Sequence, residues 1–194
     1  DSHRLSFSSL EIDSTTDFTP IILPKKTIFQ LISLLEQSSG NIKISNNKSK
    51  IKFTVGNMVL ISKVIDGRFP DYSKVIPKNN NKTLEIKLNE FKNSIERVIT
   101  VSSDRKEGLK MNISKDFLQL SVSSPSSGDG VENIKAKFNS DNMNISFNNR
   151  YLIDIASQIE NDSIIINLSD AGSPVLINDL LDINSFHVVM PMKI

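Results

Sequence analysis

The feature that most constrains the fold is a repeated pattern in which one amphipathic helix is followed by three strand-like runs. Apolar residues at helical spacing predict helices over residues 27–37 and 149–159. Their apolar faces consist of Ile28, Leu31, Ile32 and Leu35 in the first helix, and of Leu152, Ile155, Ala156 and Ile159 in the second. The strand-like runs cover residues 41–45, 50–55 and 58–64 after the first helix, and 163–168, 174–177 and 185–190 after the second. A recurring unit of this kind indicates a repeat architecture.

Between the two copies lies a further unit of the same type. Residues 83–88 read as a strand, 89–101 as a helix, and 109–114, 117–123, 131–139 and 144–148 as strands. The Ser-, Pro- and Gly-rich residues 123–130 predict a mobile loop, and Gly56-Asn57 predicts a tight hairpin. Few helices on antiparallel strands make an α+β fold. The linker-like residues 77–82 predict a boundary between residues 1–76 and 77–194.

Composition narrows the possible functions. The 194-residue chain has no Cys, two His and a formal net charge of +1, so thiolate and His-rich metal sites are excluded. Its carboxylates fall outside any metal-binding motif, and we find neither a nucleophile motif nor a Gly-rich phosphate loop. We therefore expect no cofactor, no metal and no enzymatic activity. No apolar run reaches the roughly 20 residues of a membrane span. The first residues lack an initiator Met, so we expect a fragment of a longer protein.

Two segments of the chain are the most distinctive in sequence. Residues 188–194 (VVMPMKI) form an apolar end, although chain ends are normally polar and frayed. Met side chains suit surfaces that accept varied apolar partners, although a last core strand would look similar. Residues 66–77 (DGRFPDYSKVIP) combine two aromatics with a Pro-stiffened connection, and would otherwise be read as a structured linker.

Together with residues 1–5 (DSHRL) and 173–177 (SPVLI), these segments resemble the bacterial DNA polymerase III β subunit, the sliding clamp. The resemblance covers the whole chain. It implies a chain of three similar domains, two copies of which close head-to-tail around duplex DNA with helices lining the hole. Residues 1–76 would be the C-terminal portion of the second domain, and 77–194 the complete third domain.

The resemblance also implies a hydrophobic cleft between the second and third domains, where the polymerase catalytic subunit, the clamp loader and repair proteins insert a short apolar-rich motif. Its walls would be Ser2, His3, Arg4, Leu5, Pro70, Val75, Pro174, Val188, Val189, Met190, Pro191 and Met192. Ser2 stands where many members of the family have Gly. Strand alternation places Val188 and Val189 on opposite faces, so Val189 is also expected to point inward. A wall role also explains His3 better than acid–base chemistry does, because no partner group stands at a motif spacing.

Duplex DNA would be bound through phosphates and without sequence specificity. The candidate DNA-facing residues on or beside the helices are Lys25, Lys26, Lys92, Arg97, Arg105, Lys106 and Arg150. A solvated helix face explains each of them equally well. Thr100 and Val101 align with the interface between the two chains of the ring, although Val101 could also belong to the core.

The leading hypothesis is therefore a non-catalytic processivity factor, bacterial and cytoplasmic, that tethers a polymerase to DNA by topology. The whole protein would be a homodimeric ring, and this fragment alone would be monomeric. The alternative is a standalone peptide-binding adaptor that reuses clamp domains without encircling DNA. A hydrolase is a third class, for which the sequence offers no site.

Overall fold

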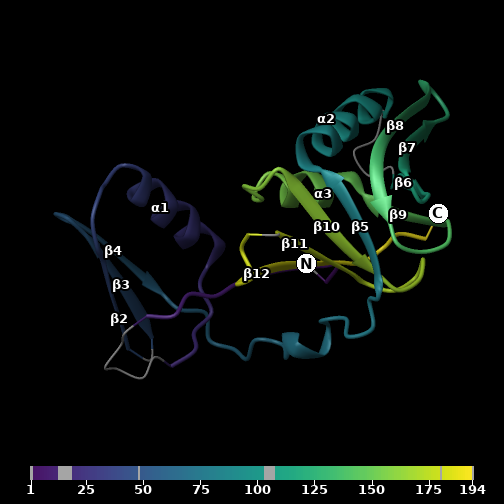
Figure 1. Cartoon of the computed structure of the whole chain (residues 1–194). Coiled ribbons are helices and arrows are strands. Elements are labelled where there is room, and N and C mark those ends of the chain that lie inside the picture. The colour runs from purple at the N-terminus through teal and green to yellow at the C-terminus, as the bar shows by residue number, and fades with distance from the viewer. Residues whose placement is uncertain (1, 13–18, 48, 103–107, 180, 194) are drawn as a thin grey trace. The chain divides into compact units, whose positions relative to one another are not determined.

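The computed structural model describes residues 2–12, 19–47, 49–102, 108–179 and 181–193, which form two compact units (Figure 1). The small unit comprises Ile12–Asp71, and the large unit combines Asp1–Glu11 with Tyr72–Ile194. The fold is α+β, with antiparallel sheets and few helices, as the sequence predicts. The chain's first strand therefore belongs to the same unit as its last.

The small unit is one helix on a three-stranded sheet. Helix α1 (Lys25–Glu36) is followed by β2 (Ile42–Asn46), β3 (Lys50–Val55) and β4 (Met58–Lys63), which pair in that order. The predicted hairpin is confirmed, because Val55 pairs with Met58 across a two-residue turn and Gly56 has a φ of +55°. A positive φ costs Gly no Cβ clash, which explains the glycine at this turn.

The large unit is built on a nine-stranded antiparallel sheet in the order β1-β12-β11-β10-β5-β8-β7-β6-β9. The strands are β1 (Arg4–Ser8), β5 (Lys82–Lys87), β6 (Gly108–Ile113), β7 (Phe117–Ser124), β8 (Gly128–Phe138), β9 (Met143–Asn148), β10 (Ser163–Leu168), β11 (Val175–Asp179) and β12 (Ser185–Val189). Its helices are α2 (Leu88–Val98), α3 (Asn149–Ala156) and the short 3-10 turns η1 (Tyr72–Lys74) and η2 (Ile99–Val101).

One continuous core holds the large unit together. Helices α2 and α3 lie next to each other (Figure 1). Both bury residues in the same apolar cluster. Phe91 and Ile95 of α2 are fully buried there, as are Leu84 and Ile166 of the sheet. Burying such side chains contributes about 1.5–3 kcal/mol each, so this core stabilises the arrangement of β12 and its neighbours.

The predicted mobile loop at residues 123–130 is wrong. The β7–β8 ladder continues to the pair Ser124–Gly128, so only three residues form the turn. Gly128 adopts a φ of +92°, and Val122 and Ser124 are buried on one side of the strand. Ser and Gly mark a tight turn as well as a loop, and here the alternation of buried residues continues through them. The helix predicted over 89–101 is also divided, because its last turn narrows to η2.

Candidate functional site

The C-terminal tail is fixed by backbone hydrogen bonds on both sides. Strand β12 lies between β11 and β1, so the last strand of the chain pairs with the first. Beyond β12, the Met190 N–H donates to the His3 carbonyl at 2.8 Å, and the Met192 N–H donates to the Ser146 carbonyl at 2.7 Å. The two methionine backbones are therefore held in place although they lie outside the strand.

The two valines of the tail have different environments. Val188 pairs with Leu5 and Val189 pairs with Arg4, so strand alternation puts them on opposite faces of the sheet. Val189 is fully buried in the core of the large unit, which confirms its predicted inward direction. Val188 lies on the face away from that core, beside Leu5 and Leu176. Val188 itself is only 3% exposed, so the half-buried Leu5 and Leu176 beside it form the accessible part of this candidate apolar surface.

Aromatic rings extend this surface along β1 and β12. The rings of Phe7 and Phe186 stack with centroids 4.8 Å apart, and Tyr72 approaches Phe7 at 5.8 Å. Val75 follows η1 and is exposed, as is Met190 at the end of β12. An apolar surface with flexible and aromatic side chains can accept apolar anchors from a partner.

Arg4 faces the helix side, and its surroundings were not foreseen from the sequence. Its Nη1 donates to the Asp154 carboxylate at 2.6 Å, and its guanidinium carbon lies 4.4 Å from the centre of the Tyr151 ring. Both partners come from α3, nearly 150 residues away in the chain. No sequence motif links Arg4 to residues of α3, so these contacts become visible only in the folded structure.

The other predicted walls are placed as follows. Ser2 and His3 are exposed next to β1, and Pro174 is half-buried directly before β11. Pro191 and Met192 are half-buried in the tail. Pro70 belongs to the small unit, where it is exposed. The large unit therefore brings the terminal segments 2–5 and 188–192 together.

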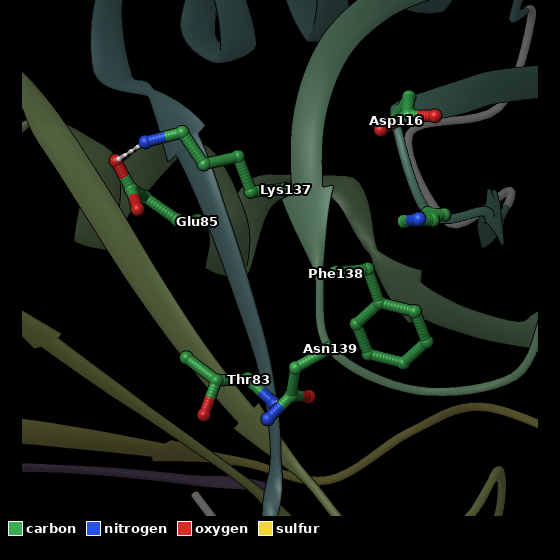
Figure 2. Close-up of a pocket in the computed structure, with 7 residues that line it drawn as sticks. Thr83, Glu85, Asp116, Lys137, Phe138 and Asn139 are labelled. Carbon is green, nitrogen blue, oxygen red and sulfur yellow. Dashed lines mark hydrogen bonds and ion pairs between the residues drawn. The ribbon is translucent and has the colours of Figure 1, made fainter.

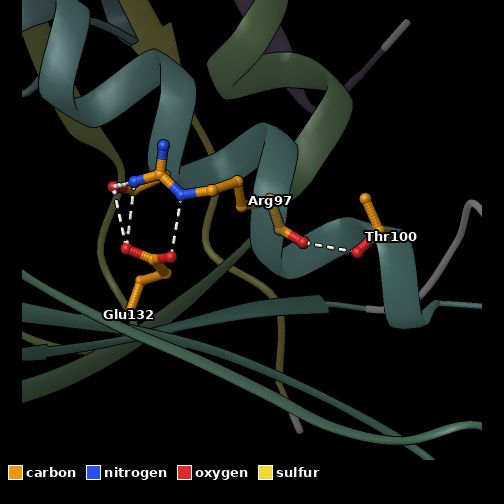
Figure 3. A network of polar contacts seen from close by, with 4 residues as sticks. Arg97, Thr100 and Glu132 are labelled. Carbon is orange, nitrogen blue, oxygen red and sulfur yellow. Dashed lines mark hydrogen bonds and ion pairs between the residues drawn. The ribbon is translucent and has the colours of Figure 1, made fainter.

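Among the predicted DNA-facing residues, Arg97 forms several side-chain hydrogen bonds, which Figure 3 shows. Its Nε and Nη2 donate to the two carboxylate oxygens of Glu132 at 2.8 and 3.0 Å, and Nη2 also donates to Ser94. The hydrogen bond from Arg97 lowers the pKa of Glu132, and the same bond raises the pKa of Arg97. A phosphate would have to compete with Glu132 for two of these donors.

The remaining basic residues are less constrained. Lys25 and Lys26 are exposed on α1, and the Lys25 ammonium lies 5.5 Å from the centre of the Phe29 ring. Lys92 is half-buried on α2, and Arg150 is exposed on α3. The predicted residues Arg105 and Lys106 lie outside the described residues.

The predicted interface residues lie at the end of α2, in η2. The Thr100 hydroxyl donates to the Arg97 carbonyl at 2.7 Å (Figure 3), and Val101 is half-buried against the core. A Cβ added to Gly130 would lie 2.8 Å from the Val98 carbonyl oxygen and 3.0 Å from a Val101 methyl group. The close approach of β8 to η2 therefore requires glycine at position 130.

A separate hollow of about 380 Å³ lies between β5, β8 and the β6–β7 turn (Figure 2). Lys137 donates to Glu85 at 3.1 Å beside it, and the Thr83 N–H donates to the Asn139 side chain at 2.7 Å. It contains none of the predicted site residues. Within the described ranges, no cluster of three His, Asp or Glu side chains could hold a metal ion, and none of the helices there is long and apolar enough to cross a membrane.

The antiparallel two-unit chain, with an apolar surface at its joined terminal strands, has the α+β clamp fold. The chain belongs to the DNA polymerase III beta subunit family. The model of the family's C-terminal domain matches residues 73–193, and the model of its central domain matches residues 1–71.

Named relatives agree with this family. The beta sliding clamp of Caulobacter vibrioides is 31% identical over 100% of this chain and 52% of its own length. That of Escherichia coli K12 is 28% identical over 100% of this chain and 53% of its own. The chain thus spans about half the length of the curated relatives it matches.

Solved structures give the same result. A sliding clamp from Bartonella birtlesii, solved bound to griselimycin, has a TM-score of 0.95 and 38% identity, covering 100% of this chain and 53% of that one. The DNA polymerase III subunit beta of Pseudomonas aeruginosa has a TM-score of 0.95 and 29% identity, with 100% and 53% coverage. The clamp fold predicted from the sequence is confirmed.

Proposed function

We propose that this chain acts as part of a non-catalytic DNA sliding clamp, which encircles duplex DNA as a homodimeric ring and tethers the replicative polymerase. The observation that carries the proposal is that two consecutive domain models of one clamp family cover almost all of the chain in order. We assign residues 1–76 to the C-terminal portion of the second clamp domain and residues 77–194 to the third. Relatives named as sliding clamps support a bacterial, cytoplasmic role in replication.

The polymerase, the clamp loader and repair proteins would bind through the apolar surface around Leu5 and Val188. Its support is the stacked Phe7 and Phe186 beside them and the exposed, backbone-anchored Met190. The griselimycin-bound clamp of Bartonella birtlesii shows that a relative of this chain takes a ligand.

Substituting Met190 and Met192 with Ala tests this site. We expect about a tenfold weaker affinity for a peptide carrying a polymerase's apolar-rich clamp motif, because two apolar anchors contribute about 1.4 kcal/mol together. Isothermal calorimetry measures the affinity, and Met58→Ala, in the small unit, is the matched control. An affinity that stays unchanged in the double variant would show that the peptide binds elsewhere.

The ring mechanism is tested on the full-length protein loaded onto DNA. A ring that holds DNA by topology stays on a circular duplex and slides off a linear one, because weak phosphate contacts must allow sliding. Equal retention on both would reject the ring and favour the adaptor alternative. Substituting a residue that contacts a phosphate should make DNA binding less sensitive to salt. The residues to substitute are Lys25, Lys26, Lys92, Arg97, Arg105, Lys106 and Arg150.

A further inference from the structure

One face of the small unit's sheet concentrates positive charge. Alternation along β3 buries Ile51, Phe53 and Val55 on one side, so Lys50 and Lys52 point to the other. We define the lysine face as Lys43, Lys50, Lys52, Lys63, Val59 and Ile61. It is directed away from α1, because the Thr27 hydroxyl of that helix lies 2.7 Å from the Ser62 hydroxyl on the opposite side of β4.

The charges of this face are not compensated within the described part of the chain. All four lysines are exposed, and no ion pair joins any of them to a described carboxylate. Lys50 stands directly opposite Lys63 in the ladder, and Lys52 lies two residues further along β3. Like charges that face each other across strands destabilise a sheet, and an anionic partner would relieve that repulsion.

Two aliphatic side chains interrupt the charges. Val59 is 53% exposed and Ile61 is 60% exposed, both on β4 and on the same face as the lysines. Ile61 stands opposite Lys52, and Val59 stands opposite Thr54. The face therefore offers ammonium groups and apolar area side by side.

The repeated unit in the other half of the chain shows that this pattern is not a property of the fold. The corresponding outward face of β10, β11 and β12 carries no charged side chain. Its side chains are those of Ile165, Asn167, Leu176, Asn178, Phe186 and Val188, of which Val188 is buried and the others are half-buried. The lysines of the lysine face thus have no counterpart on β10, β11 and β12.

We propose that the lysine face binds an acidic polypeptide segment that also carries aliphatic side chains. Its Asp and Glu carboxylates pair with the four ammonium groups, and its aliphatic side chains cover Val59 and Ile61. A nucleic acid would satisfy the lysines but leave both aliphatic side chains against a charged phosphate backbone. An anionic lipid surface is a different occupant, and the experiment below distinguishes it.

The full chain is titrated against a fluorescein-labelled short peptide that alternates Glu with Leu and Ile, and binding is read from fluorescence anisotropy. Lys50→Glu with Lys63→Glu is expected to weaken the affinity about tenfold, because two exposed attractions become repulsions. Val59→Ser with Ile61→Ser is expected to weaken it about threefold. Added salt weakens the binding of the unchanged chain, because it screens exposed charges.

Lys110→Glu with Lys135→Glu is the matched control, since both lysines are exposed on strands of the large unit and the change in net charge is identical. We expect its affinity to stay within about twofold of the unchanged chain. Thermal unfolding of each variant verifies the fold, and Lys52→Gln with Lys63→Gln provides a milder pair. The lysine-face variants must keep their affinity for the clamp-motif peptide, so this test is separate from that of the proposed function.

The proposal is overturned if the unchanged chain shows no saturable binding of the acidic peptide, or if the lysine-face pair and the control pair behave alike. It is also overturned if Lys50→Glu with Lys63→Glu abolishes binding to a duplex oligonucleotide or to phosphatidylglycerol vesicles while the peptide affinity is unaffected. A peptide with Ser in place of Leu and Ile must bind more weakly than the aliphatic one, or the role of Val59 and Ile61 is wrong.

Discussion

The two helix-and-three-strand units differ in how much of the apolar face of their helix they bury. In α3 of the large unit, Leu152 and Ile155 are buried against a core shared with α2. In α1 of the small unit, Ile28, Ile32 and Leu35 are 38%, 47% and 39% exposed, and Thr27 is the buried residue of the helix. A helical apolar stripe therefore specifies the helix, whereas burial of the stripe depends on a second layer of structure to cover it.

The largest expected effect comes from removing a buried leucine. Leu152→Ala should lower the free energy of unfolding of the large unit by about 3 kcal/mol, because it leaves a cavity among fully packed neighbours. Leu35→Ala, on the exposed stripe of α1, should cost less than about 1 kcal/mol in the small unit. Hydrogen exchange of α3 and α1 amides measures each unit separately. Equal losses at both positions would refute the contrast in burial.

Glycine positions offer a second test of how tightly each unit is packed. Gly130→Ala should destabilise the large unit by about 1–3 kcal/mol and displace η2, because its Cβ would meet the Val98 carbonyl oxygen at 2.8 Å. Gly67→Ala in the small unit meets only a flexible Ile22 methyl at 3.9 Å, so its effect should be within about 0.5 kcal/mol. Chemical denaturation gives the stability, and backbone NMR shifts of Thr100 and Val101 report η2. Unchanged shifts would mean that β8 moves instead.

Helix capping also separates the two units. The Asn148 side chain accepts a hydrogen bond from the Arg150 N–H at 3.0 Å, whereas Pro24 gives α1 no side-chain cap. Asn148→Ala should therefore reduce the stability of the large unit by about 1 kcal/mol. Asn144→Ala, on an exposed position of β9, is the matched control and should change stability by less than about 0.5 kcal/mol. If thermal unfolding shows the same loss for both, the cap contributes nothing.

Periodicity and turn residues predicted nearly all of the helices and strands, because the signals for these elements are local. The hairpin at Gly56 was predicted correctly, but the Ser- and Gly-rich turn before Gly128 was mistaken for a loop. Contacts between distant segments could not be derived in this way. The pairing of Arg4 with Asp154 and the fit of Gly130 against Val98 depend on the assembled fold, since no local pattern encodes either. The terminal segments were placed together only through resemblance to a family.

The exposed apolar stripe of α1 is a second case in which local sequence does not determine tertiary contacts. Its spacing predicts an apolar helix face, and the helix is present over Lys25–Glu36. What the spacing cannot give is the number of layers around the helix, which is a property of the whole fold. The lysine face was missed for a related reason. Only Lys50 and Lys52 share a strand, whereas Lys43 and Lys63 lie on the two neighbouring strands. The strand register alone brings the four lysines together.

The smallest expected effect is a pH dependence confined to the large unit. Both histidines, His3 and His187, belong to it, and the small unit contains none. His187 is half-buried on β12 with its Nδ1 2.8 Å from the Ser6 hydroxyl, and burial lowers the pKa of its imidazole. The unfolded chain, with a histidine pKa of about 6.5, therefore binds more protons than the folded one just below that pH.

The stability contributed by neutral His187 is thus fully present above about pH 6.5 and is lost as the pH falls below it. Protection of β1 and β12 amides against hydrogen exchange, corrected for intrinsic rates, should decrease on acidification through this range, while that of β3 in the small unit stays constant. His187→Gln should remove the dependence and the exposed His3→Gln should retain it. His187 contacts the first segment of the chain through both the strand pairing and the side chain of Ser6. If the dependence survives His187→Gln, or if β3 loses protection in parallel, then the pH sensitivity arises outside this contact.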